Sequence, residues 1–255
     1  MKVFGDAARC YDLLYRDKDY AGEAQFLHNL LQCHFPGART LLDLGCGTGR
    51  HAAHLVQEDY EIHGVELSGP MVARAQDRWQ QLAPDRAGRL TFSQGDLRTI
   101  RLGGLFDAVL ALFHVVSYQL SNDDLRAALV TAREHLKPGG GFIFDYWYGP
   151  AVLTDRPGIR VKRVEDEAVR VTRVAEPVMQ ANDNLVDINY QFFLQDKVSG
   201  RLDTFQETHR LRYLFKPEID LLLKETGFQH LLCRAWLSDQ EPGFDTWSVY
   251  SVAKK

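Results

Sequence analysis

The sequence lacks paired cysteines, long apolar runs and a hydrophobic N-terminus. Its four cysteines (Cys10, Cys33, Cys46 and Cys233) show no CxxC spacing and no matching histidine cluster, so we expect free thiols and no metal site. Nowhere do eighteen apolar residues run together, and no apolar stretch follows Lys2, which argues against a membrane span and a signal peptide. These absences predict a protein of a reducing compartment, with a cytoplasmic location.

The chain also lacks a strong charge of either sign. Its formal net charge is -4 and its isoelectric point is near 6.1, so no global field attracts a polyanion. We therefore expect a small-molecule substrate, no nucleic-acid or membrane partner, and a monomer or homodimer. The 255 residues, 45% of them hydrophobic, suffice for one substantial core that carries a large insertion.

Short apolar segments alternate with amphipathic ones over the first 150 residues. Amphipathic stretches at 8–16 and 20–35 open the chain. Further helices are predicted at 50–58, 68–82 and 121–136, and strands at 40–44, 61–66, 89–94, 106–113 and 141–146. Ser121 caps the last of these helices, and Lys137-Pro138-Gly139-Gly140 is predicted to end it. Such alternation predicts βαβ units, and hence a parallel sheet with helices on both faces.

The composition changes after Pro150. Four segments rich in Val, Tyr, Phe and Thr predict an antiparallel sheet at 159–164, 168–174, 185–194 and 204–215. A helix between Pro217 and Gly227 and strands at 228–235 and 246–253 follow. The predicted fold class is α/β, with a Rossmann-like doubly wound sheet of seven strands, mostly parallel with an antiparallel last strand, and an inserted antiparallel β lid. The expected domains are a ligand-binding α/β core with an N-terminal helical lid (1–150), the β insertion (151–215), and a C-terminal helix and strands that complete the core (216–255).

A glycine-rich turn, DLGCGTGR at 43–50, links the first strand to the next helix. Glycine lets a ligand approach the backbone closely, and the helix start offers free N–H groups. The dinucleotide pattern G-x-G-x-x-G requires its last glycine at position 50, where Arg50 stands, and this counts against NAD. Glu66, at the end of the second strand, suits the ribose of NAD and of S-adenosylmethionine alike. Asp96, after the third strand, is placed to accept a hydrogen bond from an adenine amino group.

With these motifs the chain resembles the class I S-adenosylmethionine-dependent methyltransferases. DLGCGTGR, Glu66 in VELS, Gly95-Asp96, FDAVLALF (106–113) and LKPGGGFIF (136–144) occur in that family's order and at its spacing. The resemblance implies S-adenosylmethionine as the cofactor, with its methionine moiety in the glycine-rich turn, its ribose on Glu66 and its adenine beside Asp96. The residues expected to bind it are Tyr15, Tyr20, Asp43, Gly45, Cys46, Gly47, Thr48, Gly49, Glu66, Leu67, Met71, Asp96, Leu97 and Ala111.

Three further segments carry a closer resemblance. YDLLY (11–15) followed by KDY (18–20), YWYGP (146–150) and RYLF (212–215) are similar to segments of bacterial N-methyltransferases that act on nucleotide-linked amino sugars. The resemblance implies that the β insertion covers the acceptor and that N-terminal tyrosines close over the cofactor. Glycine and other small-amine methyltransferases share these segments in part. The expected acceptor is therefore the amine of a nucleotide-linked amino sugar, and the alternatives are a small-molecule O-methyltransferase, a glycine-type amine methyltransferase and a non-catalytic cofactor-binding module.

Methyl transfer by an SN2 reaction needs the acceptor lone pair in line with the S–methyl bond, in a dry site. An amine needs little beyond positioning, whereas a hydroxyl needs a base. His114, just beyond the fourth strand, is the first candidate for a base or an orienting hydrogen bond, and packing against the lid is its other interpretation. Tyr15 and Tyr146 are the other catalytic candidates: Tyr15 can line the methyl pocket or form a core stripe with Tyr11, and Tyr146 ends the fifth strand.

Basic residues follow the predicted lid strands, namely Arg160, Lys162, Arg163, Arg170 and Arg173. A solvated strand face accounts for them, and a diphosphate-binding edge, to which His209, Arg210 and Arg212 would belong, is the alternative. A nucleic-acid adenine methyltransferase is not expected, because 112–116 contains no Pro-Pro-aromatic motif to grip an extruded base.

Overall fold

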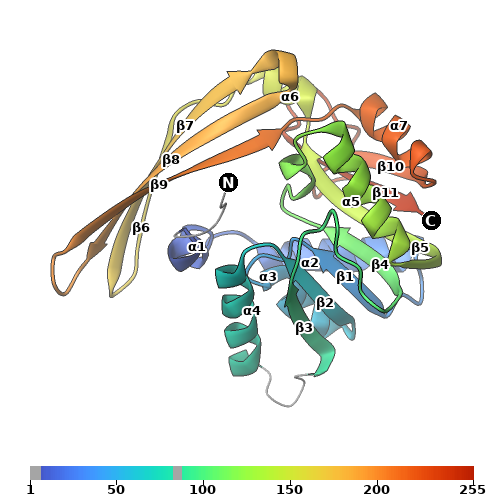
Figure 1. Ribbon diagram of the computed structural model, residues 1–255, viewed down its shortest axis with the longest axis horizontal. Coiled ribbons are helices and arrows are strands. Elements are labelled where there is room, and N and C mark those ends of the chain that lie inside the picture. The colour runs from blue at the N-terminus through green and yellow to red at the C-terminus, as the bar shows by residue number, and fades with distance from the viewer. Residues whose placement is uncertain (1–6, 83–87) are drawn as a thin grey trace.

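Two β-sheets organise the computed structural model shown in Figure 1, which describes residues 7–82 and 88–255. The larger sheet has seven strands in the order β10-β11-β5-β4-β1-β2-β3, and the smaller has four in the order β6-β7-β8-β9. In Figure 1 the smaller sheet extends away from the larger one, and helix α1 lies next to it near the N-terminus.

The larger sheet is almost entirely parallel. Its strands are β1 (Thr40–Leu44), β2 (Glu61–Glu66), β3 (Leu90–Gln94), β4 (Phe106–Ala111), β5 (Leu136–Trp147), β10 (Gln229–Ala235) and β11 (Ser248–Lys254). The neighbours β1–β2, β1–β4, β2–β3 and β4–β5 pair in parallel. Strand β11 runs antiparallel to both of its neighbours, β5 and β10. The predicted seven-stranded sheet with an antiparallel last strand is confirmed.

Helices cover both faces of this sheet. The described helices are α1 (Ala8–Leu14), α2 (Tyr20–His34), α3 (Arg50–Leu55), α4 (Gly69–Leu82), α5 (Asn122–Glu134), α6 (Gly149–Thr154) and α7 (Lys216–Glu225), with short 3-10 helices η1 (Val56–Glu58), η3 (Val116–Tyr118) and η4 (Ala181–Asp183). Buried side chains of α5 and α7 pack on one face, and those of α2, α3 and α4 pack on the other. Within residues 7–82 and 88–255, no helix has the length and apolar character that crossing a membrane would require.

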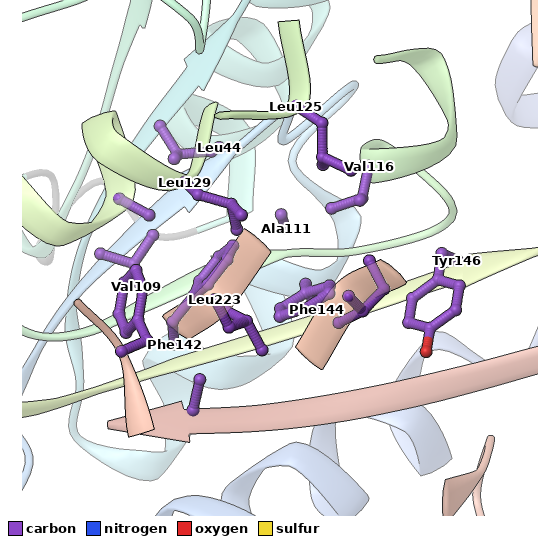
Figure 2. Packing of buried hydrophobic residues seen from close by; sticks show 14 of the residues in the cluster. Leu44, Val109, Ala111, Val116, Leu125, Leu129, Phe142, Phe144, Tyr146 and Leu223 are labelled. Atoms are coloured by element: carbon purple, nitrogen blue, oxygen red, sulfur yellow. The ribbon is translucent and has the colours of Figure 1, made fainter. Parts of the chain in front are cut away.

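Alternate side chains of β5 pack into the hydrophobic clusters on opposite faces of the seven-stranded sheet. Phe142 and Phe144 stack on each other at 4.6 Å between ring centroids and join Leu223 of α7 in one cluster, as Figure 2 shows. Ile143, between them, belongs to the cluster on the opposite face with Leu27 of α2. Because successive side chains of a strand point to opposite faces, a strand buried on both faces is apolar at nearly every position.

The smaller sheet, called the lid sheet below, consists of β6 (Arg160–Glu165), β7 (Val169–Gln180), β8 (Leu185–Asp196) and β9 (Leu202–Arg212). Each strand is antiparallel to the next. Cys10 and Leu14 of α1 are buried together with Val171, Phe192 and Leu194 of this sheet. The N-terminal helix therefore packs on the lid sheet, although more than 150 residues separate Leu14 from Val171 in the sequence.

The structure differs from the prediction where proline and glycine stand inside strands. Helix α5 ends at Glu134 and β5 already begins at Leu136, so the Lys137-Pro138-Gly139-Gly140 segment is strand rather than turn. Its pairing with β4 shifts register between Phe106 and Ala108, and Gly139 has a φ of +78°, which together describe a bulge. Strand β7 likewise continues through Pro177 to Gln180, and the short helix α6 was not predicted.

Two leucines of α7 offer a matched test of the core. Leu223 is fully buried and Leu221 is 57% exposed. We expect Leu223→Ala to lower the free energy of unfolding by about 2–5 kcal/mol, because it removes apolar contacts and leaves a cavity, whereas Leu221→Ala should change it by less than about 0.5 kcal/mol. Urea denaturation of both variants measures this. Equal losses in the two would contradict the packing of α7 described here.

Candidate active site

A cavity of about 560 Å³ lies between the carboxyl ends of the parallel strands and the lid sheet. Its core side is lined by residues that follow β1, β2, β3 and β4, which is where ligands bind in open α/β sheets. Tyr11, Tyr15 and Tyr20 from the N-terminal segment, and Tyr190 and Phe192 of the lid sheet, line its other sides. The cavity is therefore enclosed by the N-terminal segment, the α/β core and the lid sheet.

The glycine-rich turn forms one wall of this cavity. The backbone N–H groups of Gly45 and Cys46 both donate to the carbonyl oxygen of Val65, at 2.7 and 3.1 Å, which ties the turn to β2. Gly47 has a φ of +56°, and a Cβ placed on it would meet no atom within 4 Å. Its face is thus open to the cavity, and this cradle fits a ligand that contacts the backbone directly.

Glu66 is held at the edge of the same wall. Its carboxylate accepts hydrogen bonds from the backbone N–H of Gly47 at 3.1 Å and of Ser68 at 2.8 Å. Burial nevertheless raises its pKa above the ordinary glutamate value. The position fits a carboxylate that accepts the two hydroxyls of a ribose.

Asp43, beneath the turn, is the most perturbed carboxyl group of the cavity. It is 2% exposed, and its Oδ1 has no hydrogen-bond partner among the described residues. Burial, and then the charge of Glu66, raise the pKa of Asp43 to about 7. A buried carboxylate without a partner is costly, so this pair fits a ligand that brings a positive charge.

Asp96 and Leu97 line the cavity on the side of β3. The Asp96 carboxylate pairs with the Arg98 guanidinium, with 2.6 Å between Oδ2 and Nη2, and this hydrogen bond lowers the pKa of Asp96. Arg98 also contacts Asp124 of α5 at 2.7 Å. Asp96 is therefore ionised and held by Arg98, and it is half-exposed at the cavity rim.

The N-terminal segment is held against the glycine-rich turn and its neighbouring helices by polar and charged contacts. Asp12 accepts a hydrogen bond from the Thr48 hydroxyl at 2.8 Å and forms an ion pair with Arg78 at 2.7 Å. Arg50 donates to the carbonyl oxygen of Tyr15 at 3.1 Å, and its guanidinium lies 4.2 Å from the ring centroid of Tyr20. These contacts hold Tyr15 and Tyr20 over the glycine-rich turn.

His114 lies in the cavity between the residues that follow the parallel strands and the lid sheet. Its Nδ1 lies 2.8 Å from Oδ2 of Asp145, an ion-pair distance without the alignment of a hydrogen bond. The backbone N–H of His114 donates to the same carboxylate at 3.1 Å, and Asp145 is 1% exposed. Phe113 and His114 have φ values of +62° and +66°, a left-handed conformation that is rare for such residues and that gathers at functional sites.

Three expectations from the sequence are wrong in position. Tyr146 is fully buried beside Phe144, with its hydroxyl 3.5 Å from Sγ of Cys233, and does not line the cavity (Figure 2). Ala111 is buried in the same core cluster, because the backbone reaches the cavity only at the following residues. Gly49 also faces the core: a Cβ there would lie 2.7 Å from Phe92, so this glycine serves packing and not ligand contact.

The structure brings the other expected residues to the cavity, which Tyr15, Tyr20, Asp43, Gly45, Cys46, Gly47, Thr48, Glu66, Leu67, Met71, Asp96, Leu97 and His114 all line. Sequence reasoning missed Asp145 and Trp147. The two-residue alternation of β5 would have found them, because Phe142, Phe144 and Tyr146 face the core and the intervening residues must face the other way. Arg50 was missed as well, because its contact with two tyrosines depends on the fold of the N-terminal segment.

The basic residues of the lid sheet divide into two groups. Arg170, Arg210 and Arg212 pair with Glu165, Asp187 and Glu218 respectively. His209 is buried and contacts the Tyr118 hydroxyl at 2.9 Å. Arg160, Lys162, Arg163 and Arg173 form no ion pair with a carboxylate of the described residues, and of these four only Arg173 lines the main cavity.

Comparison with known proteins places the chain among methyltransferases. Residues 41–140 match the family described as "Methyltransferase domain". A dTDP-3-amino-3,4,6-trideoxy-alpha-D-glucopyranose N,N-dimethyltransferase of Streptomyces venezuelae is 33% identical over 88% of this chain and 90% of its own. A glycine/sarcosine N-methyltransferase of Parasynechococcus marenigrum is 34% identical over 91% of this chain and 77% of its own. The solved structure of S-adenosylmethionine-bound CalS10, an amino pentose methyltransferase of Micromonospora echinaspora, superposes with a TM-score of 0.75 at 26% identity, covering 100% of this chain and 98% of that one.

We expect the raised pKa of Asp43 to make cofactor binding dependent on pH. Below about pH 7 the free protein holds a proton on Asp43, and a positively charged ligand that binds the carboxylate must displace it. We expect the affinity for S-adenosylmethionine to fall by up to about tenfold for each pH unit below 7, and to level off above it. Calorimetric titration between about pH 6 and 7.5 measures this. Asp43→Asn should bind more weakly and without this slope, and an unchanged slope in that variant would remove Asp43 from the site.

Proposed function

The chain belongs to the family of class I S-adenosylmethionine-dependent methyltransferases, and on this premise we propose that it N-methylates the amine of a nucleotide-linked amino sugar. The main support for the proposal is that one cavity has two walls of different chemical character. Carboxylates and a glycine-rich turn line the cofactor side, and His114, Arg173 and aromatic rings line the side of the lid sheet. A relative that covers 88% of this chain acts on such a sugar, according to its name.

The residues of the core side fit the cofactor by their chemistry. Gly45 and Gly47 would admit its methionine moiety to the backbone, Asp43 would face its ammonium group, and Glu66 would hold its ribose. When bound, S-adenosylmethionine supplies a methyl group on a positively charged sulfur, and the sulfur keeps the bonding electrons when the amine takes the methyl group. The negative charges of Asp43 and Glu66 favour a ligand with this charge over a neutral one.

We assign His114 as the general base that accepts the proton lost by the amine. Because its Nδ1 faces the Asp145 carboxylate, Nε2 is the ring nitrogen that remains for the acceptor. The fixed carboxylate orients the ring and stabilises it once it carries the proton. The new N–C bond forms from the amine lone pair, and the proton from that nitrogen passes to Nε2 of His114.

Four tyrosines that line the cavity are unsuited to act as bases. Burial raises the pKa of Tyr20 and of Tyr190 to about 12, and it raises the pKa of Tyr11 and Tyr118 well above the ordinary value. At neutral pH these four side chains therefore remain phenols that donate hydrogen bonds and exclude water. Tyr15 is not among these four, and we assign the base to His114 because its ring faces the buried Asp145 carboxylate.

Methylation of glycine is the second candidate function, because a relative of that activity is 34% identical to this chain. Size argues against it. A cofactor and a five-atom amino acid leave much of the cavity of about 560 Å³ unfilled. A larger acceptor would also contact the residues of the lid sheet that line the cavity.

The acceptor is tested by incubating the purified protein with S-adenosylmethionine and each of three acceptors in parallel. These are dTDP-3-amino-3,4,6-trideoxyglucose, its 3-hydroxyl analogue and glycine. We expect release of S-adenosylhomocysteine and a product of increased mass with the amino sugar alone. Methylation of the hydroxyl analogue or of glycine, or turnover with none of the three, would contradict the proposed function.

The role of His114 is tested by substitution. We expect His114→Ala to lower kcat by about 100-fold or more, since general acid–base groups typically contribute that much. Asp145→Asn should lower it less, by about tenfold, because the ring remains but loses the charge that orients it. His54→Ala, on an exposed residue of α3, is the matched control and should leave kcat unchanged. A normal kcat in His114→Ala would show that positioning alone suffices.

A further inference from the structure

A second cavity, of about 310 Å³, adjoins the main one on the side of the lid sheet. Both cavities are lined by His114, Trp147, Arg173 and Tyr190, and only the second is lined by Arg160 and Trp247. We infer that the second cavity binds the nucleoside diphosphate part of the substrate, while the main cavity holds the amino sugar and the cofactor. This inference rests on the proposed function, and it assigns a binding site to the nucleoside diphosphate, the part of the substrate that does not react.

The two cavities differ in charge. In the main cavity Asp96 and Arg98 pair with each other and Arg210 pairs with Asp187, while Asp43 and Glu66 form no ion pair with a described residue. The described residues that line the second cavity include Arg160 and Arg173 and no carboxylate. A cationic ligand is therefore favoured in the first and an anionic ligand in the second. This separation matches a reaction in which one partner carries a positive sulfur and the other carries a diphosphate.

Arg173 lies at the junction of the cavities. Its Nη1 is 3.2 Å from the Tyr15 hydroxyl, and its guanidinium lies 4.9 Å from the ring centroid of Tyr190. No carboxylate of the described residues pairs with it, and its buried Nε has no hydrogen-bond partner there. A guanidinium with free donors and no counter-ion is suited to bind phosphate oxygens.

The far end of the second cavity is suited to a nucleoside. Trp147 and Trp247 meet edge to face at 5.5 Å between ring centroids, and nucleobases stack on such rings. Ser248 lines the same cavity, and its buried hydroxyl has no hydrogen-bond partner among the described residues. Arg160, at the start of β6, adds a second positive charge that forms no ion pair within the described part of the chain.

The order of these residues follows the order of groups in a nucleotide-linked sugar. The reacting amine would face His114 at the junction, the diphosphate would follow at Arg173, and the nucleoside would lie between Trp247 and Arg160. A ligand in the opposite direction would bring phosphates toward Asp43 and Glu66. Repulsion between like charges disfavours that arrangement.

Binding of dTDP alone, without any sugar, tests this assignment. The protein saturated with S-adenosylhomocysteine is titrated with dTDP by calorimetry, in the parent and in Arg160→Gln and Trp247→Leu. We expect each substitution to weaken dTDP binding by at least about tenfold, and to leave the affinity for S-adenosylhomocysteine unchanged. The matched controls are Arg163→Gln, an exposed arginine of the same strand, and Phe244→Leu, a 74% exposed ring three residues before Trp247. Both controls should bind dTDP as the parent does.

Steady-state kinetics of the same variants distinguish a failure of this inference from a failure of the proposed function. With the dTDP-linked amino sugar as acceptor, Arg160→Gln and Trp247→Leu should raise KM by at least about tenfold and change kcat by less than about threefold. If the parent methylates that sugar and both variants keep the parent KM and dTDP affinity, the second cavity is not the nucleotide site and the proposed function stands. If dTDP binding is lost in both variants but no amino sugar is methylated, the nucleotide site stands and the proposed acceptor is wrong.

Discussion

Two carboxylates at the carboxyl ends of neighbouring parallel strands, Asp43 and Glu66, are the feature on which the rest of the cavity depends. Asp43 and Glu66 belong to neighbouring strands; burial raises the pKa of both, and the charge of Glu66 raises the pKa of Asp43 further. Neither forms an ion pair with a cation of the described residues. A positively charged ligand relieves this repulsion, and the lid sheet and α1 strengthen the attraction by excluding water from the cavity.

The sequence was a good guide wherever hydrophobic period and turn chemistry act locally. The strands at 40–44 and 61–66 have the expected bounds because a short apolar run before a glycine turn has few other solutions. Tyr146 and Ala111 were misplaced because the face of a strand depends on its register with its neighbours. The left-handed backbone of Phe113 and His114 has no signal in these residue types, and only the contact with Asp145, 31 residues later, accounts for it.

The wall opposite the cofactor is built by contacts between distant parts of the chain. Ala7 donates to the Glu207 carboxylate at 2.9 Å, and Arg16 donates to the carbonyl oxygen of Glu165 at 2.8 Å. With the apolar cluster between α1 and the lid sheet, these contacts join the N-terminal helix to strands of the insertion. Asp12 then connects the same helix to the glycine-rich turn. The helix is thus the physical link between the glycine-rich turn and the lid sheet.

The lid sheet contributes no residue to either of the two buried clusters that flank the seven-stranded sheet, within the described part of the chain. Its side chains pack instead with α1, α6 and their surroundings. Substitutions in β6–β9 therefore leave these two clusters intact, whereas those at positions that pack on α1 or line the main cavity still alter the site. Under the proposed function, natural selection or an enzyme engineer can thus change the acceptor through the lid sheet while the packing of the seven-stranded sheet stays the same.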